Sequence, residues 1–127
     1  MSTYRPTDEE LKVLKVLWEK KEATVREINE AINELQEKHT GYTTTLKIMQ
    51  LMHGKGLLQR RKDGKSHIYH SLVDEQGTQS QMINNLMDQV FQGSASKLVL
   101  RALGSRRASQ EDLDEIRKFL EQLDKNT

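Results

Sequence analysis

Residues 41–72 read GYTTTLKIMQLMHGKGLLQRRKDGKSHIYHSL, and two patterns of different period meet within this stretch. Up to residue 54 the apolar residues recur three and four positions apart, which predicts an amphipathic helix. From residue 57 the period changes towards two, and Asp63-Gly64 is a strong hairpin turn signal. We therefore predict a helix over residues 42–54 and two strands over residues 58–62 and 65–71, with a basic tight turn between the strands. Gly54-Lys55-Gly56 should end the helix, since glycine readily adopts the left-handed geometry of a helix C-terminus.

Two further helices are predicted before this stretch. Thr7-Asp8-Glu9-Glu10 and Thr24-Val25-Arg26-Glu27 both have the pattern of a capping box, in which a Thr side chain and a Glu side chain satisfy each other's backbone amides. Apolar residues at helical spacing follow each box and should face a core: Leu11, Leu14, Leu17 and Trp18 in the first helix, and Val25, Ile28, Ile32 and Leu35 in the second. Three helices followed by a basic hairpin are typical of a winged helix-turn-helix, which reads a DNA groove and contacts the neighbouring phosphates.

The charge of the chain is concentrated in this region. The formal net charge of all 127 residues is only +1, but residues 40–70 hold six basic residues and one acidic residue, a local charge of +5. Residues 1–72 together carry +3, and residues 73–127 carry −2. Because phosphate binding depends on the local field, this cluster is compatible with a nucleic-acid partner. A solvated basic face is the alternative interpretation of the same charges.

One face of the predicted 42–54 helix is polar. Helical spacing places four residues on it, and their side chains suit base edges in a major groove: Thr43, Thr44, Lys47 and Gln50. Core contacts are expected on the opposite side from Thr45, Ile48, Met49 and Met52. Leu46 lies at the margin and is expected to touch a thymine methyl group or to fill a core edge. Leu51 is expected to pack near the second helix.

The hairpin and the start of the same helix supply candidate phosphate contacts. Four long basic side chains surround the tight turn, and Thr43 and Thr44 lie in a first helical turn whose free amides favour a phosphate. The candidate phosphate contacts are Tyr42, Arg60, Arg61, Lys62 and Lys65. A solvated hairpin tip is the alternative. In the hairpin itself, Leu58 and Ile68 are expected to face the core, with Tyr69 half buried.

Residues 74–127 predict a helix with a wide apolar stripe, a short apolar helix over residues 97–103 and a last helix capped by Ser109. A segment of this size has little to bury its stripes against in isolation. The helices must pack on residues 1–73 or pair with a second copy, and we favour pairing, because a dimer reads two half-sites. The candidate dimerisation residues are Met82, Leu86, Val90, Leu98, Leu103, Leu113, Ile116 and Leu120.

The expected fold is therefore mainly α-helical with a small β-hairpin wing. A winged helix-turn-helix domain is predicted over residues 1–73, and a helical dimerisation region over residues 74–127. No enzyme activity, metal or cofactor is expected. The chain has no cysteine, and His67 and His70 point to opposite faces of a strand. Residues 1–5 lack the apolar stretch of a signal peptide, and no run approaches the ~18 apolar residues of a membrane span, so we expect a cytoplasmic protein without membrane insertion.

The order of these motifs resembles the penicillinase-repressor family of bacterial transcriptional regulators (the BlaI, MecI and CopY group). The resemblance rests on TDEELKVLKVLW at residues 7–18, on Tyr42-Thr43-Thr44 with Lys55-Gly56-Leu57 after it, on Lys62-Asp63-Gly64-Lys65, and on Leu98-Val99-Leu100 followed by residues 109–120. It implies a homodimeric repressor on an inverted-repeat DNA operator. In the antibiotic-responsive branch it also implies a membrane sensor-protease, whose signal leads to cleavage within the dimerisation part.

The chain departs from this family at three places. The antibiotic-responsive branch often has an Asn-Phe pair at the cleavage point, where this chain has Arg101-Ala102, so these two residues form the candidate cleavage region. The copper-responsive branch ends in cysteine pairs, which are absent here. Many members also have threonine in place of Lys47 and arginine in place of Leu51. The operator of this chain is therefore expected to differ from those of its relatives.

Two other functions fit parts of the sequence. A one-component regulator of the MarR type would bind a small ligand between its DNA-binding and dimer regions, but residues beyond 73 offer mainly aliphatic and Met positions for a pocket. A winged helix that serves only as a protein-interaction module would not need the +5 cluster. We therefore expect a DNA-binding repressor.

Overall fold

The computed structural model describes residues 4–105 and 107–126. The chain divides into two compact units, Met1–Met82 and Ile83–Thr127. The boundary predicted from the sequence, after residue 73, lies nine residues earlier than the end of the first unit. The first unit includes the beginning of α4 (Glu75–Val90), where Thr78 is buried.

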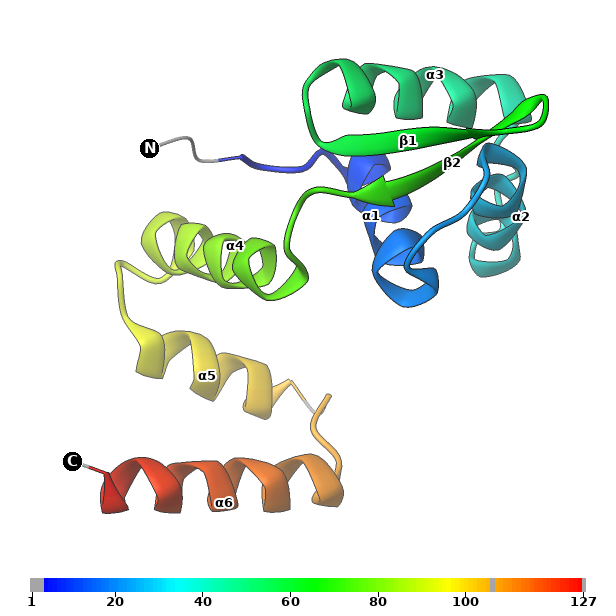
Figure 1. The fold of residues 1–127 in the computed structure, drawn as a ribbon. Coiled ribbons are helices and arrows are strands. Elements are labelled where there is room, and N and C mark those ends of the chain that lie inside the picture. The colour runs from blue at the N-terminus through cyan, green and yellow to red at the C-terminus, as the bar shows by residue number, and fades with distance from the viewer. Residues whose placement is uncertain (1–3, 106, 127) are drawn as a thin grey trace. The chain divides into compact units, whose positions relative to one another are not determined.

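The first unit is a winged helix-turn-helix, as predicted. Its elements follow one another in the order α1 (Asp8–Lys20), α2 (Val25–Leu35), α3 (Tyr42–Gly54), β1 (Leu58–Asp63) and β2 (Ser66–Ser71), and the two strands form an antiparallel hairpin (Figure 1). Both predicted capping boxes are confirmed. In the first, the Glu10 amide donates to Thr7 Oγ1 over 3.1 Å, and the Thr7 amide donates to Glu10 Oε1 over 3.0 Å. Thr24 and Glu27 repeat the arrangement at the start of α2.

The core of this unit lies among the three helices and the hairpin. Its buried apolar side chains are Val13, Leu14, Val16, Leu17, Ala23, Val25, Ile28, Ile32, Met49, Met52, Leu58 and Tyr69. Trp18 is half buried, and its indole Nε1 donates to the carbonyl oxygen of Val73 over 2.9 Å, which ties α1 to the chain after the hairpin. The prediction for Leu35 was wrong. It is 81% exposed, because the last turn of α2 extends past the core.

The turn of the hairpin lies one residue later than predicted. Asp63 pairs with Ser66, so the two central turn residues are Gly64 and Lys65, and only Gly64 has a positive φ, 63°. A glycine at the first central position is the requirement of a type II′ turn, whereas the Asp-Gly signal suggested a turn centred one residue earlier. The expected burial in β2 is also reversed. Tyr69 is fully buried, and Ile68 is only half buried, because neighbouring residues of a strand point to opposite faces.

A backbone contact between Ala23 and Tyr69 holds the hairpin against the helices. The loop between α1 and α2 forms an isolated antiparallel bridge with β2, in which the Tyr69 amide donates to the Ala23 oxygen over 2.8 Å and the Ala23 amide donates to the Tyr69 oxygen over 3.0 Å. Ala23 and Tyr69 are both buried. The wing is therefore attached to the helical core along the face that carries Tyr69.

The end of α3 is a Schellman motif. Leu57 N donates to Met52 O over 3.0 Å, and Gly56 N donates to His53 O over 3.1 Å, the two bonds that define the motif. The left-handed residue is Gly56, with φ of 80°, whereas Gly54 is the last residue of the helix. The glycine-rich end was thus predicted correctly, with Gly56 as the residue that needs the positive φ.

The second unit contains the rest of α4, α5 (Ala95–Gly104) and α6 (Gln110–Lys125). Ser94 caps α5, which begins two residues earlier than predicted, and Ser109 forms the expected cap of α6 as a full capping box with Asp112. No residue of α5 or α6 whose side chain is described is buried. Large apolar side chains instead remain exposed in this unit: Ile83, Leu86, Val90, Val99, Leu100, Phe119, Leu120 and Leu123. Across residues 4–105 and 107–126, no helix has the length and apolarity to cross a membrane.

Candidate nucleic-acid interface

The exposed face of α3 gathers the residues predicted to read bases. Thr43, Thr44, Lys47 and Gln50 are all exposed. On the opposite side, Thr45, Met49 and Met52 are buried and hold the helix against the core. The structure thus places the four candidates on one free side of α3, and their contact with bases remains a prediction.

The two leucines at the margins of this face differ from each other. Leu46 is half buried against the core, so it fills a core edge. Leu51 is 56% exposed, and its predicted packing near the second helix was wrong. Helical spacing explains the difference, since Leu51 follows Thr44 by seven residues and Lys47 by four and therefore shares their side of the helix.

The first turn of α3 offers free backbone donors. Its N-cap residue is Gly41, which has no side chain to accept a hydrogen bond. The first helical bond runs from Thr45 N to Gly41 O, so the amides of Tyr42, Thr43 and Thr44 precede the helical bonding pattern. Tyr42 is 46% exposed beside these amides. Such a helix start suits an anionic group, as the sequence suggested.

The position of this turn is fixed from inside by a buried asparagine. Asn29 of α2 donates through Nδ2 to Thr45 Oγ1 over 2.8 Å and to Thr40 O over 2.9 Å. Asn29 and Thr45 are both buried. One amide group therefore connects α2, the segment before α3 and the first turn of α3.

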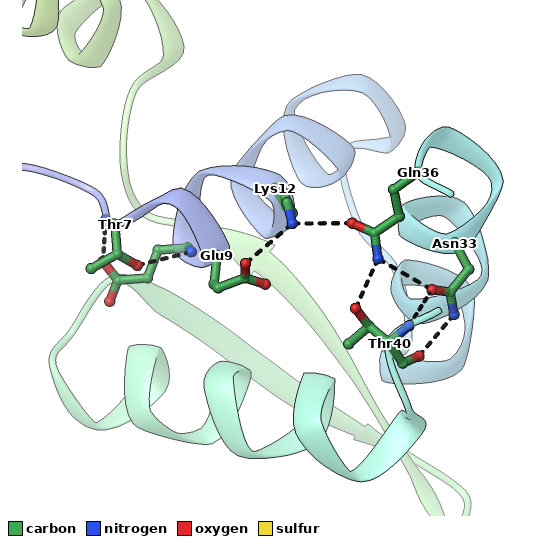
Figure 2. A network of polar contacts seen from close by, with 7 residues as sticks. Thr7, Glu9, Lys12, Asn33, Gln36 and Thr40 are labelled. Atoms are coloured by element: carbon green, nitrogen blue, oxygen red, sulfur yellow. Dashed lines mark hydrogen bonds and ion pairs between the residues drawn. The ribbon is translucent and has the colours of Figure 1, made fainter. Parts of the chain in front are cut away.

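An outer set of polar contacts surrounds the same segment (Figure 2). Thr40 N donates to Asn33 Oδ1, Asn33 Nδ2 donates back to Thr40 O, and Gln36 Nε2 donates to Thr40 Oγ1, at distances of 2.8, 2.9 and 2.8 Å. Lys12 Nζ donates to Gln36 Oε1 over 3.0 Å and so links α1 to this set. The sequence interpretation missed the network. Its signal was the polar series Asn29, Asn33 and Gln36 at helical spacing along α2 and its C-cap.

The other end of α3 is held by a carboxylate. Lys55 Nζ lies 3.2 Å from Glu10 Oε2, and Glu10 Oε1 accepts hydrogen bonds from Thr7 N and from the Tyr4 hydroxyl. Burial by itself would raise the pKa of Glu10, but the hydrogen bond from the Thr7 amide, together with those from Lys55 and Tyr4 and the Lys55 charge, holds it below its ordinary value. Burial and the neighbouring carboxylate raise the pKa of Tyr4. Lys55, one of the six basic residues in the local cluster, therefore has a structural partner.

The four basic residues of the wing fall into two pairs. Arg60 Nη1 donates to the Tyr69 hydroxyl over 3.2 Å, and Arg61 Nη2 lies 2.9 Å from Glu22 Oε1 in an exposed ion pair. Lys62 and Lys65 are exposed next to the turn, and no ion pair within the described part of the chain involves either of them. The arginines are thus oriented by the protein, whereas the lysines are available to an anionic partner directly.

His67 and His70 occupy different positions on β2, one half buried and one exposed. The ring of His67 lies edge-on to Tyr69, with ring centroids 6.4 Å apart. Within residues 4–105 and 107–126, no group of three or more His, Asp or Glu residues is arranged to hold a metal ion.

Comparison with known proteins gives consistent matches over most of the chain. The model of the penicillinase repressor family matches residues 6–122. The methicillin resistance regulatory protein MecI of Staphylococcus aureus (strain N315) is 30% identical over 119 residues, which cover 93% of this chain and 94% of that protein. The penicillinase repressor of Bacillus licheniformis is 29% identical over 117 residues, which cover 91% of this chain and 89% of that protein.

The fold also matches a solved structure. The solution structure of the DNA binding domain of the repressor BlaI superposes with a TM-score of 0.51 at 23% identity, and covers 58% of this chain and 88% of that one. At this identity the likeness supports the winged-helix fold of the first unit.

Proposed function

The chain belongs to the penicillinase repressor family, and we propose on this basis that it is a DNA-binding transcriptional repressor acting in the cytoplasm. The observation that carries the proposal is the polar side of α3, exposed beside a free first turn and a basic wing. An exposed helix face of this composition has the donors and acceptors that distinguish base pairs in a major groove.

The residues divide into two roles. We propose that Thr43, Thr44, Lys47 and Gln50 read base edges. Phosphate contacts come from Tyr42, Arg60, Arg61, Lys62 and Lys65. Phosphate contacts set orientation and most of the affinity, whereas base contacts set sequence preference. The free amides at the start of α3 would add to these phosphate contacts.

We further propose that two copies bind together on an inverted-repeat operator. The support is the second unit, whose three helices leave large apolar side chains exposed. Several large exposed apolar side chains in one small unit are typical of an interaction site, and a symmetric pair is the commonest solution. The contacts would be made by Met82, Leu86, Val90, Leu98, Leu103, Leu113, Ile116 and Leu120. Of these, Leu86, Val90 and Leu120 are exposed, and the other five are half buried.

Relief of repression by proteolysis completes the proposal. The candidate cleavage region, Arg101-Ala102, lies within α5 and is exposed, so a protease would reach it after local opening of this short helix. A cut there would separate α6 from the rest of the dimerisation region. A membrane sensor-protease is the partner that the family relationship suggests.

The test is DNA binding across a salt series, with duplexes from the chain's own upstream region and random duplexes of equal length. Lys47→Ala should lower the preference for the upstream operator by about tenfold, since one base contact is worth ~1–3 kcal/mol. Arg61→Ala should weaken both duplexes about equally and reduce the salt slope by about 1. Absence of binding, or binding that is indifferent to salt, would contradict the proposed function.

A further inference from the structure

Leu51 is the one large apolar side chain that the polar side of α3 exposes beyond its first turn. More than half of it is open, 56%, although neighbouring Met49 and Met52 are completely buried. Exposure of an isolated leucine is common on protein surfaces. Here, however, its position four residues after Lys47 places it within the proposed reading surface, where it has no hydrogen bond to offer.

The residue next to Leu51 on this side of the helix is a glycine. Gly54 follows by three residues, is exposed, and has helical φ. A Cβ added to Gly54 would meet nothing within 4 Å, so packing inside the protein does not require a glycine there. Because Gly54 has no side chain, it does not shield Leu51 from a partner that approaches this side of α3.

Only one base presents an apolar group to the major groove. Thymine carries its C5-methyl group there, and aliphatic side chains recognise it by contact. Along a helix, four residues correspond to about 6 Å, which is close to two base-pair steps of ~3.4 Å. A thymine about two steps from the base pair under Lys47 therefore lies within reach of Leu51.

We propose that Leu51 is a specificity-determining residue that recognises the C5-methyl group of a thymine in each half-site. This inference rests on the proposed function and adds one base position that the polar residues do not read. It also gives a reason for the exposure of Leu51. Another strongly exposed leucine of this unit, Leu35, lies on α2 and lines a groove with α1 residues, so it serves as a matched control.

The experiment uses the full chain and a duplex that it selects from a random DNA pool. Each thymine of the selected duplex is then replaced singly by deoxyuridine, which lacks only the methyl group. At one position in each half-site, the wild-type chain should bind the uracil duplex about three- to fivefold more weakly, the loss expected for one methyl contact. Leu51→Ala should bind the thymine and uracil duplexes equally at this position. Leu35→Ala should retain the wild-type difference.

A second variant tests the same position without relying on loss of affinity. Leu51→Gln should select a duplex from the pool in which adenine replaces thymine at that position, because glutamine pairs with adenine in the major groove. Both substitutions are at an exposed site, so the helical circular dichroism spectrum should be unchanged.

Three outcomes would overturn the inference. The first is a selected duplex in which no thymine is sensitive to loss of its methyl group. The second is a sensitivity that persists unchanged in Leu51→Ala. Either result leaves the proposed function intact, because the duplex was selected. The third outcome is failure of the wild-type chain to select any sequence. This result would contradict the proposed function as well as the inference.

Discussion

At the scale of single residues, Glu10 joins three parts of the first unit. Its carboxylate completes the cap of α1, accepts from Tyr4 and pairs with Lys55 just after α3. The capping role was predictable from the spacing of Thr7 and Glu10. The bond to Lys55 was not, because it depends on how α3 crosses the start of α1, and from the sequence Lys55 was only one of the six residues of the basic cluster.

The pH dependence of stability should reveal this carboxylate. Its folded-state pKa lies below the ordinary value of 4.5, so its stabilising effect is present above pH 4.5 and is lost as the pH falls through the lower folded value. Glu10→Gln should reduce the free energy of unfolding by about 1–3 kcal/mol at neutral pH, because a hydrogen-bonded buried charge is replaced. Urea unfolding should show a smaller difference at about pH 3. Exposed Glu9→Gln is the control and should change stability by less than about 1 kcal/mol. A pH-independent effect of Glu10→Gln would contradict the role of its charge.

Glu22 is an acidic residue that acts on the wing. It pairs with Arg61, so the proposed phosphate contact of Arg61 would exchange this carboxylate for a phosphate. Glu22→Gln should increase affinity for random duplex about two- to fivefold at low salt, with a steeper salt slope. Fluorescence anisotropy over a salt series measures both. Glu34→Gln removes the same charge from α2 and should have a smaller effect. Equal effects of the two variants would show that net charge, and not the Arg61 pair, is responsible.

At the scale of elements, the helices were predictable because several local signals agree. The capping boxes indicate where α1 and α2 begin, and the glycine-rich segment indicates where α3 ends. The apolar spacing within each helix needs no reference to the rest of the chain. The hairpin was predictable as a unit, but its register was not. The buried face of β2 does not follow from the turn, since a shift of the turn by one residue moves each cross-strand partner by two residues and leaves the side chains on the same faces. The bridge from Ala23 to Tyr69 instead holds the Tyr69 side of the strand against the core.

The two faces of α3 were also only partly predictable from the sequence. Its buried side was clear from the apolar spacing, and the polar side followed by exclusion. Leu51 was misplaced because a leucine was expected to have a packing partner, whereas its angular position is that of Thr44 and Lys47, which are proposed to read bases. The burial of Asn29 was not predicted, because a polar residue on a helix does not by itself indicate a buried hydrogen-bond partner.

The Asn29 contact should determine how firmly the start of α3 is held. Asn29→Ala leaves the buried Thr45 hydroxyl without its donor and should destabilise the unit by about 1–3 kcal/mol. Thr45→Val removes the hydroxyl while it keeps the shape, and the double variant should show a coupling of ~0.5–3 kcal/mol in urea unfolding. Operator affinity should fall in Asn29→Ala under conditions in which the protein remains folded. Additive effects of the two substitutions would rule out a direct stabilising contact.

At the scale of the whole molecule, the two units differ in what they bury. The first has a core of twelve apolar residues, whereas α5 and α6 bury none of the side chains that the structure describes. The sequence indicated this contrast, because the apolar stripes of residues 74–127 have little within that segment to pack against. It did not show that the first unit extends into α4 as far as Met82.

Assembly should therefore depend on the second unit. By sedimentation, the full chain should be a dimer, and the fragment of residues 1–82 should be a folded monomer. Leu120→Asp should shift the full chain towards monomer, because a charge would be buried in the contact surface. Leu35→Asp makes the same change in the first unit and should leave the dimer intact. A full chain that sediments as a monomer at micromolar concentrations would contradict the proposed pairing.

The attachment of the wing has a consequence for the order of events during synthesis. Ala23 meets its partner only after Tyr69 has been made, and Trp18 meets its acceptor only after Val73. All the core residues named above precede Val73, and α5 and α6 follow it. Because chains emerge from the N-terminus and fold in units, the winged helix can close while those helices are still being translated. A newly made chain would therefore complete its winged helix before the helices of the proposed dimerisation region are available to pair.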